Sequence, residues 1–119
     1  MEKILVTTDF SDNSKAGMRF SIRLAMQYKF QLTFFHVYNI TPPTAWSNSK
    51  QAGYEQAEIK KIRHKLDAFV KKIYQGMKRK PGNSNCVVES SVLAQEKIIE
   101  YANSNGFSFI CLSTRGAGN

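Results

Sequence analysis

Two hydrophobic spacings alternate along this chain: short continuous apolar runs, and longer stretches in which apolar residues recur every third or fourth position. Ile4–Val6 form the first continuous run, which ends in Thr7, Thr8 and Asp9. Such a run is typical of a strand that is buried on both faces of a parallel sheet, and the residues after it favour turns and helix caps. We therefore predict a buried first strand that ends at an acidic residue.

The next stretch predicts a strand–helix–strand unit. Ser11 is the expected N-cap of a helix that runs to about Tyr28, and Leu32–Tyr38 is a second buried strand rich in β-formers. A helix of this length between two strands forms a right-handed crossover, which joins strands that run parallel. The helix has a polar stripe at every fourth residue: Lys15, Arg19, Arg23 and Gln27. The opposite side is expected to pack on the sheet through Ala16, Phe20, Leu24 and Ala25.

An irregular connection is predicted next, because Asn39–Gly53 contains two prolines and many polar residues. It follows the carboxyl end of a strand, so we expect it to hang over any ligand site. Trp46 is expected either to stack on a ligand or to cover the edge of the core. The longest helix then runs from Tyr54 to Gly76 or Lys78, where apolar residues recur at helical spacing.

The last part of the chain predicts a third strand at Cys86–Ser90, a helix at Ala94–Asn103 and a fourth strand at Phe107–Leu112. Glu89 favours an edge position for the third strand. The regular alternation of strands and helices predicts an α/β fold with a doubly wound parallel sheet, helices on both faces and strand order 3-2-1-4.

Composition and length restrict the class of protein further. The 119 residues suffice for one domain, and an apolar fraction of 42% excludes a disordered chain. No apolar run is long enough to span a membrane, and no signal peptide is recognisable. We therefore expect a soluble, cytoplasmic domain without a membrane partner.

The charge is strongly basic, because 17 Lys and Arg against 9 Asp and Glu give a net charge of +8. Nine of the basic residues fall between Lys60 and Lys80. We interpret them as the solvated side of an amphipathic helix. Binding of nucleic acid or of another anionic polymer is the lower-ranked alternative, since no base-stacking aromatics are interleaved with these lysines.

The cysteines and histidines predict no catalytic or metal site. Cys86 and Cys111 form no metal-ligand spacing, and Cys111, within an apolar run, is expected to be a small buried thiol. His36 is expected to be a hydrogen-bonded core residue, and His64 to be solvated.

Candidate chemistry gathers at the carboxyl ends of the predicted strands. Asp9 with its two threonines follows the first strand, Val37 lies in the second, and a Gly-rich segment with Arg115 follows the fourth. Backbone N–H groups beside glycines can approach an anion closely. Neither the paired acids of phosphotransfer domains nor a catalytic triad or a known phosphate-loop motif is present. We therefore predict a ligand-binding domain that is not an enzyme.

Three segments resemble the universal stress protein (UspA-type) family: residues 3–12, residues 32–37 and residues 109–116. The resemblance runs through the whole chain in order. It implies a Rossmann-like fold of the adenine nucleotide alpha-hydrolase-like type with a five-stranded parallel sheet. It also implies a role in the stress response, dimerisation through the last strand and, in many members, bound ATP or AMP.

The resemblance also implies roles for individual residues. Asp9 would meet the edge of the adenine or the ribose, with Thr7 beside it, and Val37 would contact the adenine. The remaining implied contacts lie at the end of the chain: Leu112 and Ser113 with the base and sugar, Arg115 and Gly116 with the ribose and phosphates. This chain has Ser113 where the family motif begins with glycine, and Thr7 where binding members often have proline.

The second half of the family motif, the last helix and the fifth strand have no counterpart before Asn119. We therefore expect residues 1–119 to be a single domain that is truncated or is the N-terminal part of a longer chain. A homodimer or a tandem domain is expected to cover the fourth strand. Two functions stay open: weak binding of ATP or AMP, and a structural or regulatory dimerisation module that binds no nucleotide.

Overall fold

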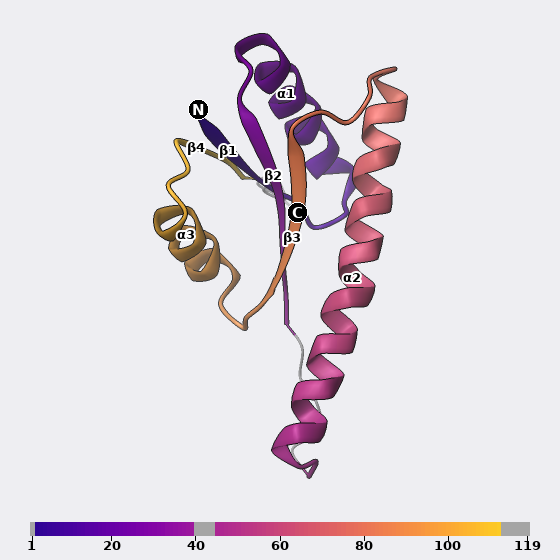
Figure 1. The fold of residues 1–119 in the computed structure, drawn as a ribbon, viewed down its shortest axis with the longest axis vertical. Helices are drawn as coiled ribbons and strands as arrows, with labels where there is room; N and C mark the ends of the chain where they lie inside the picture. Colours follow the sequence, from indigo (N-terminus) through magenta and orange to yellow (C-terminus); the bar gives the residue numbers. More distant parts are fainter. Residues whose placement is uncertain (1, 40–44, 113–119) are drawn as a thin grey trace.

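A computed structural model describes residues 2–39 and 45–112. In chain order the elements are β1 (Lys3–Thr7), α1 (Asp12–Tyr28), β2 (Gln31–Tyr38), α2 (Asn48–Gly76), β3 (Ser84–Ser90), α3 (Ala94–Ser104) and β4 (Phe109–Cys111). All strand pairs are parallel and the spatial order is β3-β2-β1-β4 (Figure 1). The predicted α/β class, the doubly wound sheet and the strand order are confirmed.

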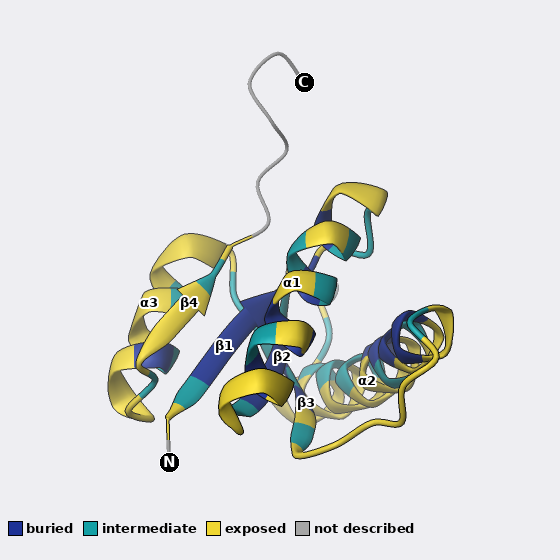
Figure 2. Cartoon of the chain, turned by 90° about the horizontal axis from the view of Figure 1, so that it is seen from above, coloured by how far each residue is buried: buried dark blue, intermediate teal, exposed yellow. Residues whose placement is uncertain are grey.

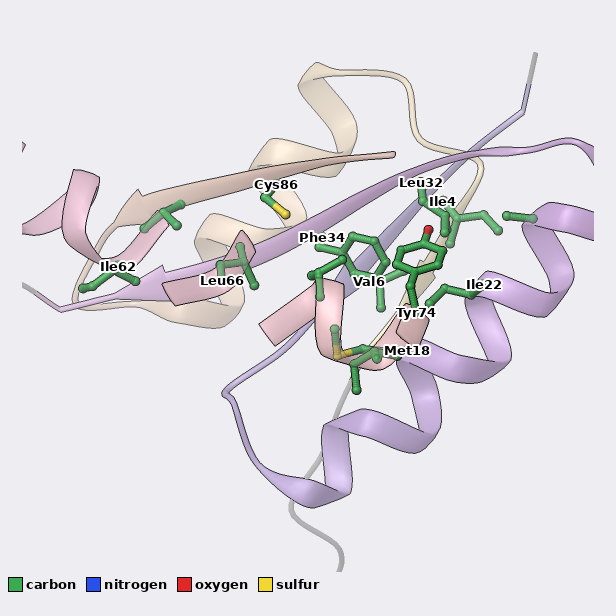
Figure 3. Packing of buried hydrophobic residues seen from close by; sticks show 14 residues of the cluster. Ile4, Val6, Met18, Ile22, Leu32, Phe34, Ile62, Leu66, Tyr74 and Cys86 are labelled. Atoms are coloured by element: carbon green, nitrogen blue, oxygen red, sulfur yellow. The ribbon is translucent and has the colours of Figure 1, made fainter. Parts of the chain in front are cut away.

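The sheet separates two layers of helices. α1 and α2 cover one face and α3 covers the other (Figure 2). Because side chains alternate along a strand, Ile4 and Val6 point into the larger core under α1 and α2, whereas Leu5 points toward α3. Phe34 and Tyr74 meet edge to face in the larger core, with ring centroids 6.4 Å apart (Figure 3).

The prediction for the buried face of α1 was half right: Ala25 is buried and Leu24 packs against the core, but Ala16 and Phe20 do not face the sheet. Phe20 is 60% exposed and Ala16 is also exposed, whereas the buried positions are Ser14, Met18, Ser21, Ile22 and Ala25. Small residues let the helix lie close to the sheet: a Cβ on Gly17 would come within 3.3 Å of the Cys111 sulfur. The Ser14 hydroxyl is buried without penalty, since it donates to the Ser11 carbonyl at 2.7 Å.

The start of α2 also corrects the predicted irregular connection, because residues 48–53 are helical. The Ser47 hydroxyl caps the helix by accepting from the Lys50 N–H at 3.3 Å. Trp46 is not among the described residues that pack against the core: its ring centroid lies 5.4 Å from that of Tyr54 in α2, with the Lys50 ammonium 4.5 Å from the Trp46 centroid. The first buried residue of α2 is Ile62, so the preceding turns project beyond the sheet (Figure 1).

The two outer strands of the described sheet, β3 and β4, differ in how far their side chains are buried. β3 lies at one edge, as predicted, and its Cys86 is buried; burial, with the Asp67 carboxylate as the second cause, raises the pKa of this thiol to about 12. β4 is shorter than predicted, since the N–H of Phe107 bonds to the Ala102 carbonyl and so belongs to the end of α3. Cys111 is only half-buried at this edge.

Among residues 2–39 and 45–112, the structure contains no helix that is both long and apolar enough to cross a membrane.

Candidate functional site

A cleft of about 210 Å³ lies at the carboxyl ends of β1 and β2, on the face that α3 covers. The structure brings Thr7, Asp9 and Val37 together there, as the strand order requires. Ligands of open parallel sheets bind beyond the carboxyl ends of strands where the winding direction reverses, and β1 adjoins that reversal. The cleft residues are Thr7, Thr8, Asp9, Phe35, His36, Val37, Ala94, Gln95 and Ile98.

The turn between β1 and α1 is held by its own hydrogen bonds. One carboxylate oxygen of Asp9 accepts from the Ser11 N–H at 3.0 Å, and the buried Thr8 hydroxyl accepts from the Phe10 N–H at 3.1 Å. The Thr8 N–H donates to the Phe35 carbonyl at 3.1 Å, which ties the turn to β2. These bonds fix the direction of the Asp9 carboxylate before any ligand arrives.

Phe10 adopts a left-handed backbone conformation, with φ at 66°, which is unfavourable for a bulky residue. Its ring compensates by packing on the α2 side of the sheet, 4.6 Å from the His36 ring and 5.4 Å from Phe69. The Lys65 ammonium lies 4.5 Å from the Phe10 centroid. This aromatic contact anchors the turn that carries Asp9.

His36 supports the same turn from β2. Its Nδ1 lies 2.7 Å from the Thr8 carbonyl, so that nitrogen carries a proton and donates to the oxygen. Burial lowers the pKa of the imidazole below its usual 6.5; the Lys65 charge acts in the same direction, and the Thr8 bond and Asp9 oppose it. His36 is therefore hydrogen-bonded, as the sequence predicts, but it is half-buried and not a core residue; His64 is exposed as expected.

The lowered pKa of His36 makes stability depend on pH. The unfolded chain binds this proton more readily, so stability is fully present above pH 6.5 and is lost as pH falls through the folded pKa. We expect His36→Asn, which keeps a donor for Thr8, to lose less stability between pH 7.5 and pH 5 than the parent protein does in urea unfolding. His64→Asn, which removes the exposed histidine, is the control; equal slopes for His36→Asn and the parent would contradict this prediction.

The N-terminus of α3 also faces the cleft, through Ala94 and Gln95, and the sequence reasoning missed it. Its N-cap, Leu93, makes no side-chain cap hydrogen bond, and the Leu93 N–H donates to the Ser91 hydroxyl at 3.1 Å. The order of elements could have indicated this contact, because a helix that follows a parallel strand begins at the carboxyl edge of the sheet, where Asp9 also lies. Gln95 adds a side-chain amide that can both donate and accept.

Of the other predicted ligand residues, the structure describes Leu112 alone. Leu112 is 57% exposed and is not among the cleft residues. Ser113, Arg115 and Gly116 lie outside the described residues. Thr7 links the cleft to β4, since its hydroxyl donates to the Cys111 carbonyl at 3.4 Å. Within the described part of the chain, no cluster of three His, Cys, Asp or Glu residues could hold a metal ion.

The fold and the cleft define a doubly wound α/β domain with a candidate binding site at the strand ends. The model of the universal stress protein family matches residues 1–119, and the chain belongs to this family. The family resemblance seen in the sequence is thereby confirmed. No curated protein matches the chain.

Solved structures agree with the fold. The universal stress protein UspA from Lactobacillus plantarum has a TM-score of 0.70 at 17% identity, over 99% of this chain and 82% of its own. A protein of the universal stress protein family from Burkholderia pseudomallei has a TM-score of 0.58 at 18% identity, over 95% of this chain and 81% of its own. A third structure, a universal stress protein in complex with cAMP, has a TM-score of 0.60 at 14% identity, over 92% of this chain and 69% of its own.

Proposed function

We propose that this chain is a cytoplasmic stress-response domain that binds an adenine nucleotide weakly at the strand-end cleft and catalyses no reaction. The observation that carries the proposal is the convergence of Asp9 and Val37 in one cleft of a universal stress protein fold. The cAMP complex of a related structure supports an adenine ligand for this fold.

The chemistry of the cleft suits the base and sugar better than the phosphates. Val37 and Ile98 offer apolar surface to the adenine, and the Asp9 carboxylate can accept from the base or the ribose hydroxyls. The phosphates would be left to Arg115 and the backbone near Gly116. The cleft of about 210 Å³ is also below the roughly 300–1,000 Å³ that is common for ligand pockets, which favours weak binding.

Calorimetric titration with adenosine, AMP and ATP tests this proposal. We expect all three to bind weakly, and ATP to bind only slightly more tightly than adenosine, because few cationic contacts serve the phosphates. A large preference for ATP would contradict this division of roles. Absence of binding by all three would overturn the nucleotide proposal.

The alternative function is a dimerisation module without a nucleotide, and one observation favours it. β4 is an outer strand of the described sheet; its Phe109 and Ile110 are exposed by 51% and 42%, and Leu112, which follows it, by 57%. Exposed apolar edge strands tend to pair with another chain. Sedimentation of the protein that shows a homodimer without nucleotide would support this alternative, and a monomer at all concentrations would remove it.

A further inference from the structure

A second cavity lies between the facing turns of α1 and α2, on the side of the sheet opposite α3. Its volume is about 340 Å³, larger than the strand-end cleft, and the two share no residue. Its wall combines three cations with an aromatic and an aliphatic side chain and a glycine. The residues are Lys15, Arg19, Phe69, Lys72, Ile73 and Gly76. We call it the α1–α2 groove.

The positive charge of the groove is largely uncompensated. Lys15 pairs with Asp12 at 2.8 Å, and this is the one salt bridge between residues that the structure describes. Arg19 and Lys72 thus face the groove with no acidic partner in the described part of the chain. Asp67, the nearest acid along α2, interacts with the Cys86 thiol instead. Gathered like charges raise the local concentration of anions.

The floor of the groove is apolar. Ile73 is buried, and Phe69 is half-buried with the Lys15 ammonium 5.8 Å from its ring centroid. Gly76 ends α2 and leaves open space, since a Cβ there would meet no atom within 4 Å. A cavity with an apolar floor and a few convergent charged groups has the make-up of a small-molecule site.

We propose that the α1–α2 groove binds a small organic anion, in which a phosphate or a comparable dianionic group is attached to a flat apolar body. Arg19 and Lys72 hold the anionic group, Arg19 with the planar fork that matches phosphate oxygens. The apolar body lies over Phe69 and Ile73. The groove shares no residue with the strand-end cleft, so either binding proposal can be disproved without affecting the other.

Phenyl phosphate is the probe, titrated into the ¹⁵N-labelled protein while backbone amide signals are followed. We expect saturable shifts at Arg19, Phe69, Lys72 and Gly76. Inorganic phosphate tests the charge alone and benzyl alcohol the apolar body alone; both are expected to bind more weakly than phenyl phosphate. Removing one cation with Arg19→Gln weakens phenyl phosphate by roughly tenfold or more.

Gly76 offers a matched pair of variants. Gly76→Ala and Gly76→Glu both remove a glycine from the end of α2, which favours the helix, but only the second places a negative charge in the groove. We expect Gly76→Ala to bind phenyl phosphate like the parent protein and Gly76→Glu to lose binding. Equal binding by the two variants, or the absence of shifts at the groove in the parent protein, would overturn the proposal.

Discussion

Replacing Phe34 with alanine is expected to lower the free energy of unfolding by about 3–5 kcal/mol, the largest effect of a single change predicted here. Phe34 lies on the central strand β2, is fully buried and contacts the Tyr74 ring (Figure 3). The substitution removes that contact and leaves a cavity between the sheet and α2, which the close-packed neighbours can fill only in part. Urea unfolding followed by far-UV circular dichroism measures the loss.

Phe20→Ala is the matched control, since it makes the same chemical change on α1, where the ring is 60% exposed. We expect its free energy of unfolding to stay within about 0.5 kcal/mol of the parent value. If Phe20→Ala destabilised the protein as much as Phe34→Ala, the orientation of α1 described above would be wrong.

The second large effect is expected at Asp9. Asp9→Asn keeps an oxygen that can accept from the Ser11 N–H, so the turn is preserved, but the carboxylate that would accept from the ligand is lost. Loss of a charge-assisted hydrogen bond of about 1.5–3 kcal/mol weakens adenosine and AMP by roughly tenfold to a hundredfold. Calorimetric titration measures the change.

Glu2→Gln removes the same charge at the opposite end of β1, where the side chain is exposed, and is expected to bind adenosine like the parent protein. An Asp9→Asn variant that binds adenosine with parental affinity would place the ligand elsewhere on the molecule.

The strands and their order followed from the sequence because their signals are local and strong. The continuous run Ile4–Val6 and the β-rich run ending at Tyr38 belong to central strands, which must be apolar on both faces. Right-handed crossovers then leave few possible arrangements of the sheet. Glu89 indicated the edge position of β3, because a charged residue is unfavourable in a central strand that is buried on both faces.

The rotation of α1 and the start of α2 did not follow from the sequence. Hydrophobicity placed Phe20 in the core, but the close approach of Gly17 to Cys111 and the hydrogen-bonded Ser14 decide which side faces the sheet. Residues 48–53 of α2 bury almost nothing, so no apolar periodicity marked them. Only the cap at Ser47 and the contact of Trp46 with Tyr54 identify that end.

The candidate site was predicted in part. Asp9 and Val37 were expected to be neighbours because parallel strands end at the same edge, and the structure brings them together. Gln95 was missed because no local motif marks it, although the start of α3 after β3 places it at the same edge of the sheet as Asp9. The left-handed Phe10 and its contact with His36 depend on packing between distant segments, which no local pattern encodes.

The central claim is that an adenine ligand occupies the strand-end cleft, and an NMR titration of the ¹⁵N-labelled protein with adenosine tests it most directly. Adenosine carries no phosphate, so binding at the basic α1–α2 groove does not obscure the result. The account predicts saturable shifts at the amides of Thr8, Asp9, Val37 and Gln95, and none at Arg19 or Gly76. Shifts confined to other amides, or no shifts at all, would contradict it.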